Sequence, residues 1–361
     1  MNPVRLASIG LGRWARVLAR GAQRGSVIEL VNCFSRREET RAAFQGEFGI
    51  LRSASSLDEL LSDPEVEGVL VTTPNDTHKS VILESIDAGK AVYTDKPIAH
   101  TMEDAGQIAA AAKAAGVGLA VGHSARRLAG HRLMRRWIDD GRVGRVSLAE
   151  ANFSNERGLE LTTDTWRFFA DKSPGGALIQ LGVHHADTLQ YLLGPVAAVT
   201  SVARRLYTPA EVPDAVMTIL EFEAGPLGYI GTGWASPAVY QLRLLGTEAN
   251  LLYDLDVTHW SESHVVDEFS TLVSQAYHQS ERPRVELPAT DMFREQLEEF
   301  ALAIRGEADI EVGADEAIRA LAVVHAALES SARNGQAVAV VPMLEAAGMA
   351  TATATASGGR A

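Results

Sequence analysis

Short, continuously apolar segments alternate with longer amphipathic segments through the first third of the chain. Short apolar runs bounded by turn residues predict buried strands, and longer runs with apolar residues three or four positions apart predict helices. Strands are expected at residues 4–9, 28–34, 69–71, 91–93 and 118–121, and helices at residues 13–24, 38–48, 57–61, 78–88 and 102–115. Strands that are apolar throughout and are separated by helices are typical of a parallel sheet covered on both faces.

The pattern changes after about residue 123. A helix is expected at residues 130–139, and the segments beyond it alternate apolar and polar residues, as antiparallel strands with one face in water do. These strands are expected at residues 146–154, 199–206, 215–223, 228–235, 241–246 and 250–254, and further helices at residues 177–193, 291–305 and 315–333. The alternation therefore predicts a second, α+β domain with a large, mostly antiparallel open sheet.

The size and charge of the chain narrow the classes of function. A single hydrophobic core rarely exceeds roughly 250–300 residues, so the 361 residues predict two domains. The 33 basic and 46 acidic side chains give a net charge of −13, which argues against nucleic acid and against an anionic membrane as partners. The single cysteine, Cys33, excludes an internal disulfide. Neither a signal peptide nor a membrane-spanning run is recognised, so a cytoplasmic location is expected.

A glycine turn follows the first predicted strand and opens the first predicted helix. The segment GLGRWA, residues 10–15, has the spacing G-x-G-x-x-A of the dinucleotide-binding (Rossmann) fingerprint. The first glycine permits the tight turn, and the second lets the backbone approach a pyrophosphate at the helix N-terminus. The alanine keeps the helix close to the sheet. The candidate cofactor contacts of this turn are Gly10, Gly12, Arg13, Trp14 and Ala15.

The end of the second predicted strand bears on the choice between NAD and NADP. An NAD-selective site usually has Asp or Glu here, which binds the ribose 2′-hydroxyl. This chain has Ser35, followed by Arg36 and Arg37. A missing carboxylate and two guanidinium groups suit the 2′-phosphate of NADP, so the sequence favours NADP. The alternative is that the two arginines only begin a solvent-exposed helix.

Two polar loops follow the third and fourth predicted strands, at the sheet edge where open α/β sheets bind ligands. The first is either an ordinary loop or the lining of the ribose and nicotinamide site, with the candidates Thr73, Pro74, Asn75 and His78. The second contains Asp95 and Lys96 in front of a proline, which restricts the backbone on both sides. A lysine held in this way can stabilise a developing alkoxide. The alternative is an exposed surface lysine.

A second glycine turn, at residues 173–176, opens the helix expected at residues 177–193. Gln180 and His184 are four residues apart and share one face of that helix, whereas His185 points elsewhere. Asp187 follows three residues after His184 and could orient or charge-stabilise a histidine. A neutral imidazole is a natural general base for a hydroxyl proton near pH 7. A histidine buried for structural reasons is the alternative.

Taken together, these motifs resemble the glucose–fructose oxidoreductase / inositol dehydrogenase / rhizopine-catabolism oxidoreductase family. The matching segments are GLGRWA, TTPNDTH, DKP, GHSARR and PGGALIQLGVHHAD, in the order and spacing of the family, over about residues 4–340. The resemblance implies a Rossmann domain and an α/β domain whose large open sheet often packs against another subunit. We therefore expect an NAD(P)-binding Rossmann domain at residues 1–123, a substrate-binding and oligomerisation α+β domain at residues 124–345, and a disordered tail at residues 346–361.

The resemblance also implies roles for individual residues. Lys96 matches the catalytic lysine of the family, and His184 matches its catalytic histidine. Arg126 falls in the stretch after the family's sixth strand, which faces the active site. Trp166 and Arg167 match a Trp-Arg pair near cofactor and substrate.

Two positions depart from the family pattern. Asp95 replaces the usual Glu before the lysine, which is a mild change. Gln180 replaces the usual Asp four residues before the histidine. Because an amide cannot take up a proton, Gln180 is expected to position the substrate while His184 carries the proton alone.

Three hypotheses for the function follow. The first is an NAD(P)-dependent oxidoreductase acting on a secondary hydroxyl or ketone of a sugar, cyclitol or related polyol, with Lys96 stabilising the oxygen and His184 as acid/base. The second is dehydrogenation of an aromatic cis-dihydrodiol carboxylic acid, with Arg126 and Arg167 binding the carboxylate. The third is a non-catalytic, nucleotide-sensing regulator on the same fold. No metal is expected, because no Cys or His cluster has zinc-like spacing. A homodimer or homotetramer is expected, because an open sheet face needs covering.

Overall fold

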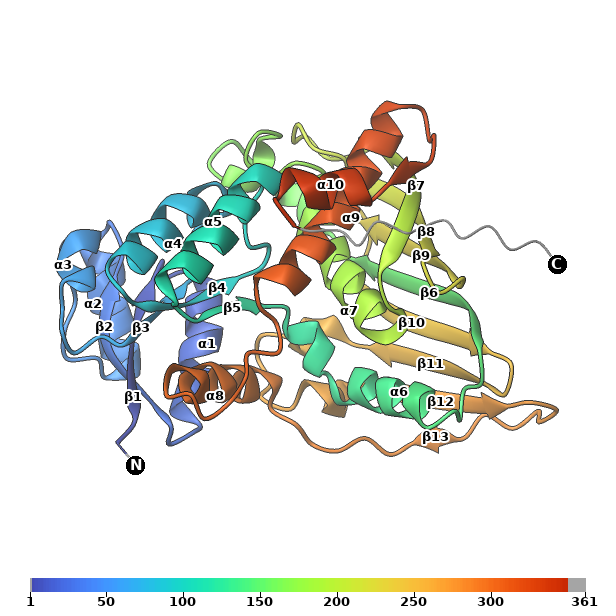
Figure 1. Cartoon of the computed structure of the whole chain (residues 1–361), viewed down its shortest axis with the longest axis horizontal. Coiled ribbons are helices and arrows are strands. Elements are labelled where there is room, and N and C mark those ends of the chain that lie inside the picture. Colours follow the sequence, from blue (N-terminus) through green and yellow to red (C-terminus); the bar gives the residue numbers. More distant parts are fainter. Residues whose placement is uncertain (1, 350–361) are drawn as a thin grey trace.

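The computed structural model describes residues 2–349, which form a smaller parallel sheet with its helices and a broad second sheet beside it (Figure 1). The ordered chain extends past the boundary expected at residue 346. Helix α10 (Val341–Ala346) ends there, and Ala347 is buried with its backbone against Gly106. The rest of the tail that was expected to be disordered, residues 350–361, lies outside the described residues.

The N-terminal sheet is parallel, as predicted. Within the described chain it has the strand order β2-β1-β3-β4-β5. Its strands are β1 (Val4–Ile9), β2 (Ile28–Phe34), β3 (Gly68–Val71), β4 (Ala91–Asp95) and β5 (Leu119–Gly122). Its helices are α1 (Arg13–Gln23), α2 (Glu38–Phe48), α3 (Leu57–Leu61), α4 (His78–Asp87) and α5 (Met102–Ala115). The order of the strands reverses between β1 and β3, and the carboxyl ends of strands at such a point border a crevice that binds ligands.

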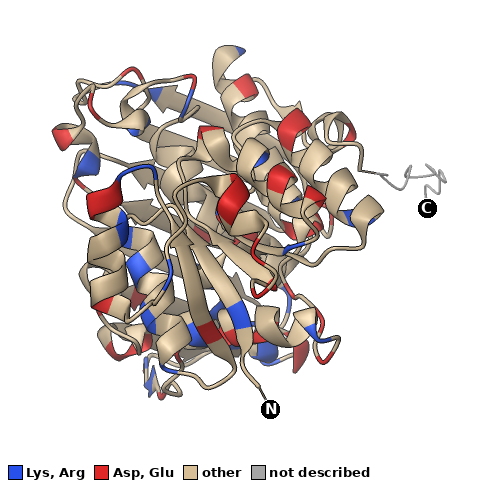
Figure 2. Cartoon of the chain, turned by 90° about the vertical axis from the view of Figure 1, so that its left-hand side faces the viewer, with Lys and Arg blue, Asp and Glu red and all other residues tan. Residues whose placement is uncertain are grey.

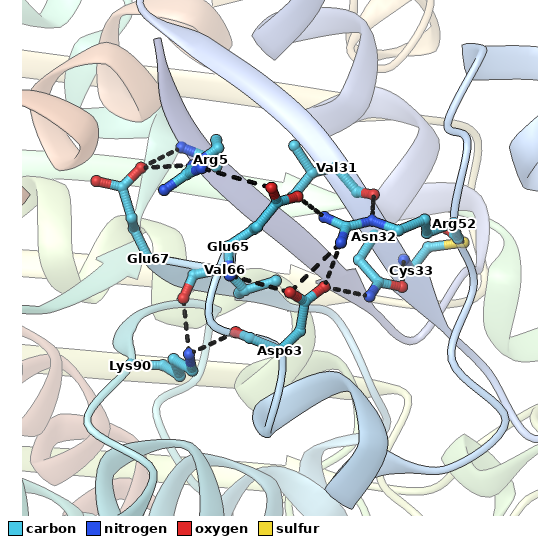
Figure 3. A network of polar contacts seen from close by, with 10 residues as sticks. All are labelled: Arg5, Val31, Asn32, Cys33, Arg52, Asp63, Glu65, Val66, Glu67 and Lys90. Carbon is cyan, nitrogen blue, oxygen red and sulfur yellow. Dashed lines mark hydrogen bonds and ion pairs between the residues drawn. The ribbon is translucent and has the colours of Figure 1, made fainter. Parts of the chain in front are cut away.

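A polar network fixes the segment that leads into β3 (Figure 3). The backbone N–H of Arg5 in β1 donates to Glu67, and Asn32 in β2 donates its amide N–H to Asp63. The ammonium of Lys90 donates to the carbonyl oxygens of Asp63 and Val66 at 2.9 and 2.8 Å. Arg52 adds ion pairs to Asp63 and Glu65 and donates to the carbonyl oxygen of Val31 in β2, so the network ties this segment to β1 and β2 partly through side chains of opposite charge. Part of the charge of the N-terminal domain, which Figure 2 shows interspersed over that side of the molecule, is thereby neutralised locally.

The C-terminal sheet is large and mostly antiparallel, as predicted. In the described residues its order is β13-β12-β11-β10-β6-β9-β8-β7-β14, and β6 and β9 form the parallel pair. Its strands are β6 (Val146–Ser154), β7 (Val196–Arg204), β8 (Ala215–Phe222), β9 (Leu227–Gly233), β10 (Val239–Gly246), β11 (Ala249–Leu255), β12 (Ser270–Ala276), β13 (Arg284–Val285) and β14 (Val338–Ala339). Helices α6 (Ala129–Asp139), α7 (Val183–Leu193) and α9 (Ala314–Ala332) cover one face of it (Figure 1).

The opposite face of this sheet carries apolar side chains that no described helix covers. From Val216 onward, residues of β8 alternate between buried and exposed, and the exposed set includes Met217 at 62% and Ile219 at 50%. Leu227 in β9 and Val202 in β7 add to the same exposed group. An exposed apolar surface on one face of a sheet is typical of an interaction site.

Several elements of the structure differ from the predicted ones, among them α10, which was not expected. Strand β12 has the sequence STLVSQA, in which only Leu272 is buried, so its apolar signal is weak. Strands β13 and β14 have two residues each, too few for any pattern. The helix predicted at residues 177–193 is two segments, a π-helical turn at Leu178–Gly182 followed by α7.

Helix α8 (Met292–Ile304) belongs to the second domain by sequence position but packs against α1 of the first. The rings of Trp14 and Phe293 meet edge to face at 5.5 Å, and Arg24 forms an ion pair with Asp291 at the start of α8. The contact is close because Gly21 lies at the interface, where a Cβ atom would be 3.2 Å from Phe293. No helix within residues 2–349 combines the length and the apolar character needed to cross a bilayer.

Candidate active site

The glycine turn has the geometry of a dinucleotide site. Gly10 has φ +85°, and a Cβ atom on it would lie 2.8 Å from Thr73, so glycine is required there. A Cβ atom on Gly12 would project into open space. Helix α1 begins at Arg13, and no side chain caps its first backbone N–H groups. Free N–H groups at a helix N-terminus attract an anion such as a pyrophosphate.

Several buried polar atoms around this turn find no hydrogen-bond partner among the described residues. They are Trp14 Nε1, Thr73 Oγ1, Asn75 Nδ2 and Asp95 Oδ1. Buried polar groups are nearly always paired, so these atoms mark the crevice as a place where water or a polar ligand binds. Their positions, at the carboxyl ends of β3 and β4 and at the start of α1, fit a bound dinucleotide. Ala15 is buried beneath the turn.

His78 lies behind this crevice and supports two of its loops. Its ring nitrogens are 2.9 Å from the carbonyl oxygen of Pro97 and 3.0 Å from that of Thr73. The side chain is buried, and burial lowers the pKa of its imidazole. The neutral ring carries one N–H and donates it to one of these two carbonyl oxygens, so His78 packs between the Thr73 and Pro97 loops, and its contact with the cofactor stays a prediction.

The segment that the sequence associates with NADP lies beside the glycine turn. The backbone N–H of Gly10 donates to the carbonyl oxygen of Phe34 at 3.0 Å, which brings the end of β2 to the crevice. Ser35 is half-buried, and its carbonyl oxygen accepts from Arg41. Arg36 and Arg37 are exposed, and neither guanidinium forms an ion pair with a described residue.

Lys96 joins the two domains at the site. It follows β4 in front of a cis Lys96–Pro97 peptide bond, and its ammonium donates to the backbone carbonyl oxygen of Gln180 at 2.9 Å. Burial lowers the pKa of Lys96 to about 8, with Asp95 opposing the shift and the nearby Arg167 adding to it. The alternative that Lys96 is an ordinary exposed surface lysine is therefore wrong.

Gln180 lies in the π-helical turn in front of α7, and its side chain is already engaged. Its amide oxygen accepts from Arg167 Nε at 3.4 Å, and its amide nitrogen donates to Ser173 Oγ at 3.3 Å. The guanidinium of Arg167 in turn stacks over the ring of Trp166, 4.2 Å from the ring centroid. Single π-helical turns within or beside α-helices are frequent at functional sites. Gln180 in this turn therefore accepts a hydrogen bond from Lys96 through its backbone carbonyl and one from Arg167 through its side-chain amide oxygen.

His184 is buried at the start of α7. Its ring packs against Phe153 at 5.6 Å and Trp260 at 5.8 Å, and Nδ1 has no hydrogen-bond partner among the described residues. Burial, together with the positive charge of Lys96, holds the pKa of His184 well below its ordinary value. The imidazole is therefore neutral at pH 7 and can accept a proton.

Arg126 and Asp187 form a buried ion pair, which corrects two expectations. Arg126 Nε and Nη2 donate to the two carboxylate oxygens of Asp187 at 3.1 and 2.5 Å, and both side chains are buried. Asp187 therefore binds an arginine and hydrogen-bonds no described histidine, although its negative charge raises the pKa of His123, as expected of a charge-stabilising carboxylate. Arg126 follows β5, the last strand of the parallel sheet. Because its Nε and Nη2 groups already bind Asp187, the guanidinium is not free to bind a substrate carboxylate in the same bidentate way.

Sequence reasoning missed two residues of the site. His123 directly follows β5 and is buried, and neither of its ring nitrogens has a partner among residues 2–349. Its position at the carboxyl end of a predicted strand was a usable signal. Trp260 comes from an irregular segment far along the chain, where no pattern marks it. In the described residues, no group of three or more His, Cys, Asp or Glu side chains is arranged to hold a metal ion.

A glycine turn with this geometry, at the carboxyl ends of a parallel sheet, is typical of the NAD-binding oxidoreductases. The sequence pattern of an oxidoreductase family with an NAD-binding Rossmann fold matches residues 4–123, and that of the GFO/IDH/MocA C-terminal domain matches residues 131–252. The chain belongs to the GFO/IDH/MocA family of oxidoreductases.

Relatives support this assignment over nearly the whole chain. The 1,5-anhydro-D-fructose reductase of Ensifer adhaerens is 31% identical over 335 residues, which cover 92% of this chain and 97% of the relative. The scyllo-inositol 2-dehydrogenase (NAD(+)) of Bacillus subtilis is 28% identical, over 76% of this chain and 83% of the relative. A crystal structure from Desulfitobacterium hafniense, described as an NADPH-dependent oxidoreductase, has a TM-score of 0.92 at 41% identity, and covers 95% of this chain and 99% of that one.

Proposed function

We propose that the protein transfers hydride between NAD(P) and a secondary hydroxyl or ketone of a sugar, cyclitol or related polyol. The observation that carries the proposal is the meeting of Lys96, from the Rossmann domain, with the turn that presents His184, from the second domain. The names of the Ensifer and Bacillus relatives, a sugar-derivative reductase and an inositol dehydrogenase, support the substrate class.

The residues of the chain divide the work as follows. His184, neutral at pH 7, accepts the proton of the substrate hydroxyl. Lys96 donates a hydrogen bond to the same oxygen and stabilises the negative charge that develops on it. Arg167 and the Gln180 amide bind neighbouring hydroxyl groups and orient the ring. Bound NAD(P) supplies the hydride acceptor in oxidation and the donor in reduction.

The proposed cofactor is NADP in preference to NAD. Arg36 and Arg37 are exposed and free of ion pairs with described residues, and Ser35 stands where a carboxylate would repel a 2′-phosphate. The description of the Desulfitobacterium relative as NADPH-dependent agrees with this preference. Trp14, Thr73, Asn75 and Asp95 would contact the rest of the dinucleotide.

We further propose that copies of the chain associate through the open face of the C-terminal sheet. Met217 and Ile219 are large apolar side chains held outward by the alternation of β8. Burying them against a second copy removes apolar surface from water. The expected product is a homodimer or a homotetramer.

The test is a panel of polyols, cyclitols and sugars with NAD(H) and NADP(H), followed by nicotinamide absorbance. Lys96→Ala and His184→Ala should each lower kcat by about 10²-fold or more, because each removes a group that acts in the transition state. Lys113→Ala, on an exposed face of α5, is the matched control and should keep full activity. Full turnover in the first two variants would disprove the assignment. The panel also includes dihydrodiol carboxylic acids. We expect no turnover of these, because Arg126 is paired with Asp187 and cannot bind the substrate carboxylate together with Arg167.

A further inference from the structure

The orientation of the proposed base, His184, depends on packing, because no residue of the described chain hydrogen-bonds its Nδ1. A catalytic imidazole is ordinarily oriented by a hydrogen bond to its second ring nitrogen. Here two aromatic rings border the imidazole instead. The ring centroid of Phe153 lies 5.6 Å from that of His184, and the centroid of Trp260 lies 5.8 Å from it at an interplanar angle of 64°. Phe153 and Trp260 are themselves 6.1 Å apart, so the three rings form one cluster.

The two aromatic rings are held in different ways. Phe153 belongs to β6, which is paired with a strand on each side in the C-terminal sheet. Trp260 directly follows the short helix η6 (Val257–His259), outside the sheet, although its side chain is only 7% exposed. The sheet therefore fixes the place of Phe153, whereas the place of Trp260 depends on the segment that carries it.

This segment, residues 256–263, is called the η6 segment below, and it is attached to the second domain near its start. The backbone N–H of Asp256 donates to the carbonyl oxygen of Phe269 at 3.0 Å, and the ring of His259 stacks on that of Phe269 at 3.7 Å. The backbone N–H of Ser263 donates to the carbonyl oxygen of His259 at 3.0 Å, which closes a turn around the residues between them. The corner of that turn is free to contact the other domain.

The corner of the η6 segment meets the Rossmann domain at the glycine turn. Ser261 Oγ accepts a hydrogen bond from Nη2 of Arg13, which is the first residue of α1 and directly follows Gly12. The adjacent residue, Trp260, packs against His184. Two neighbouring residues thus contact the dinucleotide turn of one domain and the proposed base of the other.

We propose that the η6 segment couples the dinucleotide turn to the base, with Trp260 as a positioning residue for His184 and Ser261 as the residue that holds Arg13. The proposal rests on the proposed function. The Arg13 guanidinium would bind an anionic dinucleotide at the start of α1, and its hydrogen bond to Ser261 passes this restraint to the next residue. Trp260 then keeps the imidazole in one orientation, so the base is best ordered when the cofactor is bound.

The first test compares Trp260→Phe and Trp260→Ala with the wild-type protein. Phenylalanine keeps a ring beside His184, so kcat should stay within about threefold of wild type, whereas alanine leaves a gap, so kcat should fall about tenfold or more with KM nearly unchanged. The gap also admits water to the imidazole. Because burial lowers the pKa of His184, the acid limb of the kcat profile should move to higher pH in Trp260→Ala.

The shift of the acid limb distinguishes positioning from a general loss of stability. Lys96 after β4, His123 after β5 and His185 on α7 also lower the pKa of His184, and the Trp260 variants leave all three in place. Trp137→Ala is the matched control, because Trp137 is 9% exposed on α6 and packs under the guanidinium of Arg142. It should destabilise the protein without moving the acid limb.

The second test is amide hydrogen exchange in the η6 segment, read by mass spectrometry, which needs no turnover. Saturation with NADPH should slow exchange in this segment of the wild-type protein about tenfold. Ser261→Ala removes the acceptor for Arg13, so it should abolish this slowing and weaken NADPH binding about threefold. Ser261→Thr keeps the hydroxyl group and should preserve both the slowing and the affinity.

Each half of the proposal can be refuted. A kcat within twofold of wild type in Trp260→Ala, or an acid limb that this variant leaves unmoved, would overturn the positioning role. Should Trp260→Ala fail to fold, Trp260→Leu takes its place, because it also removes the aromatic face. The coupling is wrong if NADPH leaves exchange in the η6 segment unchanged, or if Ser261→Ala responds to NADPH as the wild type does. Wild-type protein that binds NADPH but turns over no member of the panel would instead refute the proposed function.

Discussion

The ammonium of Lys96 should lose its proton far more readily than that of an ordinary lysine. Its pKa is lowered to about 8 by burial and by the neighbouring Arg167. At pH 8 about half of the Lys96 side chains are then neutral, against about 0.4% of lysines with the usual pKa near 10.4. The neutral fraction at pH 8 therefore differs by about 100-fold.

Competitive reductive methylation with a small aldehyde, read by mass spectrometry of the lysine peptides, measures this fraction. The chain has five lysines, so Lys79, Lys113 and Lys172 serve as internal references in the same sample. The midpoint of the pH profile reports the pKa independently of how accessible the side chain is. Arg167→Gln should raise that midpoint by removing a like charge, and Asp95→Asn should lower it by removing an opposite one.

The same shift predicts how stability depends on pH. The pKa of Lys96 is lower in the folded than in the unfolded protein, so between about pH 8 and 10.4 the unfolded chain binds more protons. Stability should therefore rise with pH across this window. Lys96→Met should abolish that rise and stabilise the protein at pH 7 by up to about 3 kcal/mol, while abolishing turnover. A Lys96 midpoint near 10, or a Lys96→Met variant less stable than wild type, would refute this account of the site.

Three further predictions concern the ion pair, the cofactor and the assembly. Asp187→Asn should lower the free energy of unfolding by about 3–5 kcal/mol in urea titrations, because it leaves Arg126 charged and buried, and the double variant Arg126→Met/Asp187→Leu should recover most of it. A loss below about 1 kcal/mol would mean that the pair is not buried. Arg36→Ala and Arg37→Ala should each weaken NADPH binding about tenfold in fluorescence titrations and leave NADH binding unchanged, whereas equal weakening of both would contradict a contact with the 2′-phosphate. Met217→Asp should shift the assembly to a smaller species in light scattering, with Met217→Leu as the control, and a wild-type monomer would disprove the interface.

The sequence predicted the Rossmann domain well because its signals are local. Strands that are buried on both faces appear in the sequence as continuous apolar runs. The turn after β1 needs a glycine at residue 10, which has φ +85° and lies against Thr73, and this requirement is visible as the G-x-G-x-x-A motif. Lys96 and His184 were found because they follow such elements directly. Lys96 contacts the carbonyl oxygen of Gln180, four residues before His184, and that contact depends on how the two domains pack.

What the sequence did not predict depends on contacts between distant segments. Asp187 has the spacing that would support a histidine on a helix, but the stronger partner, Arg126, approaches from another element 61 residues away. The π-helical turn at Leu178–Gly182 changes which residues share a helix face, and no pattern in its sequence LIQLG predicts it. Trp260 reaches His184 from an irregular segment, and β12 is too polar to show a period.

The packing of α8 on α1 has a consequence for how the protein folds while it is being synthesised. Residues 292–304 emerge from the ribosome long after residues 13–23, so the surface that holds Trp14, Gly21 and Arg24 waits uncovered until most of the chain has been synthesised. A fragment that ends near residue 123 would keep that surface permanently bare. An isolated cofactor-binding module should therefore be built by joining α8 to the first 123 residues through a designed linker.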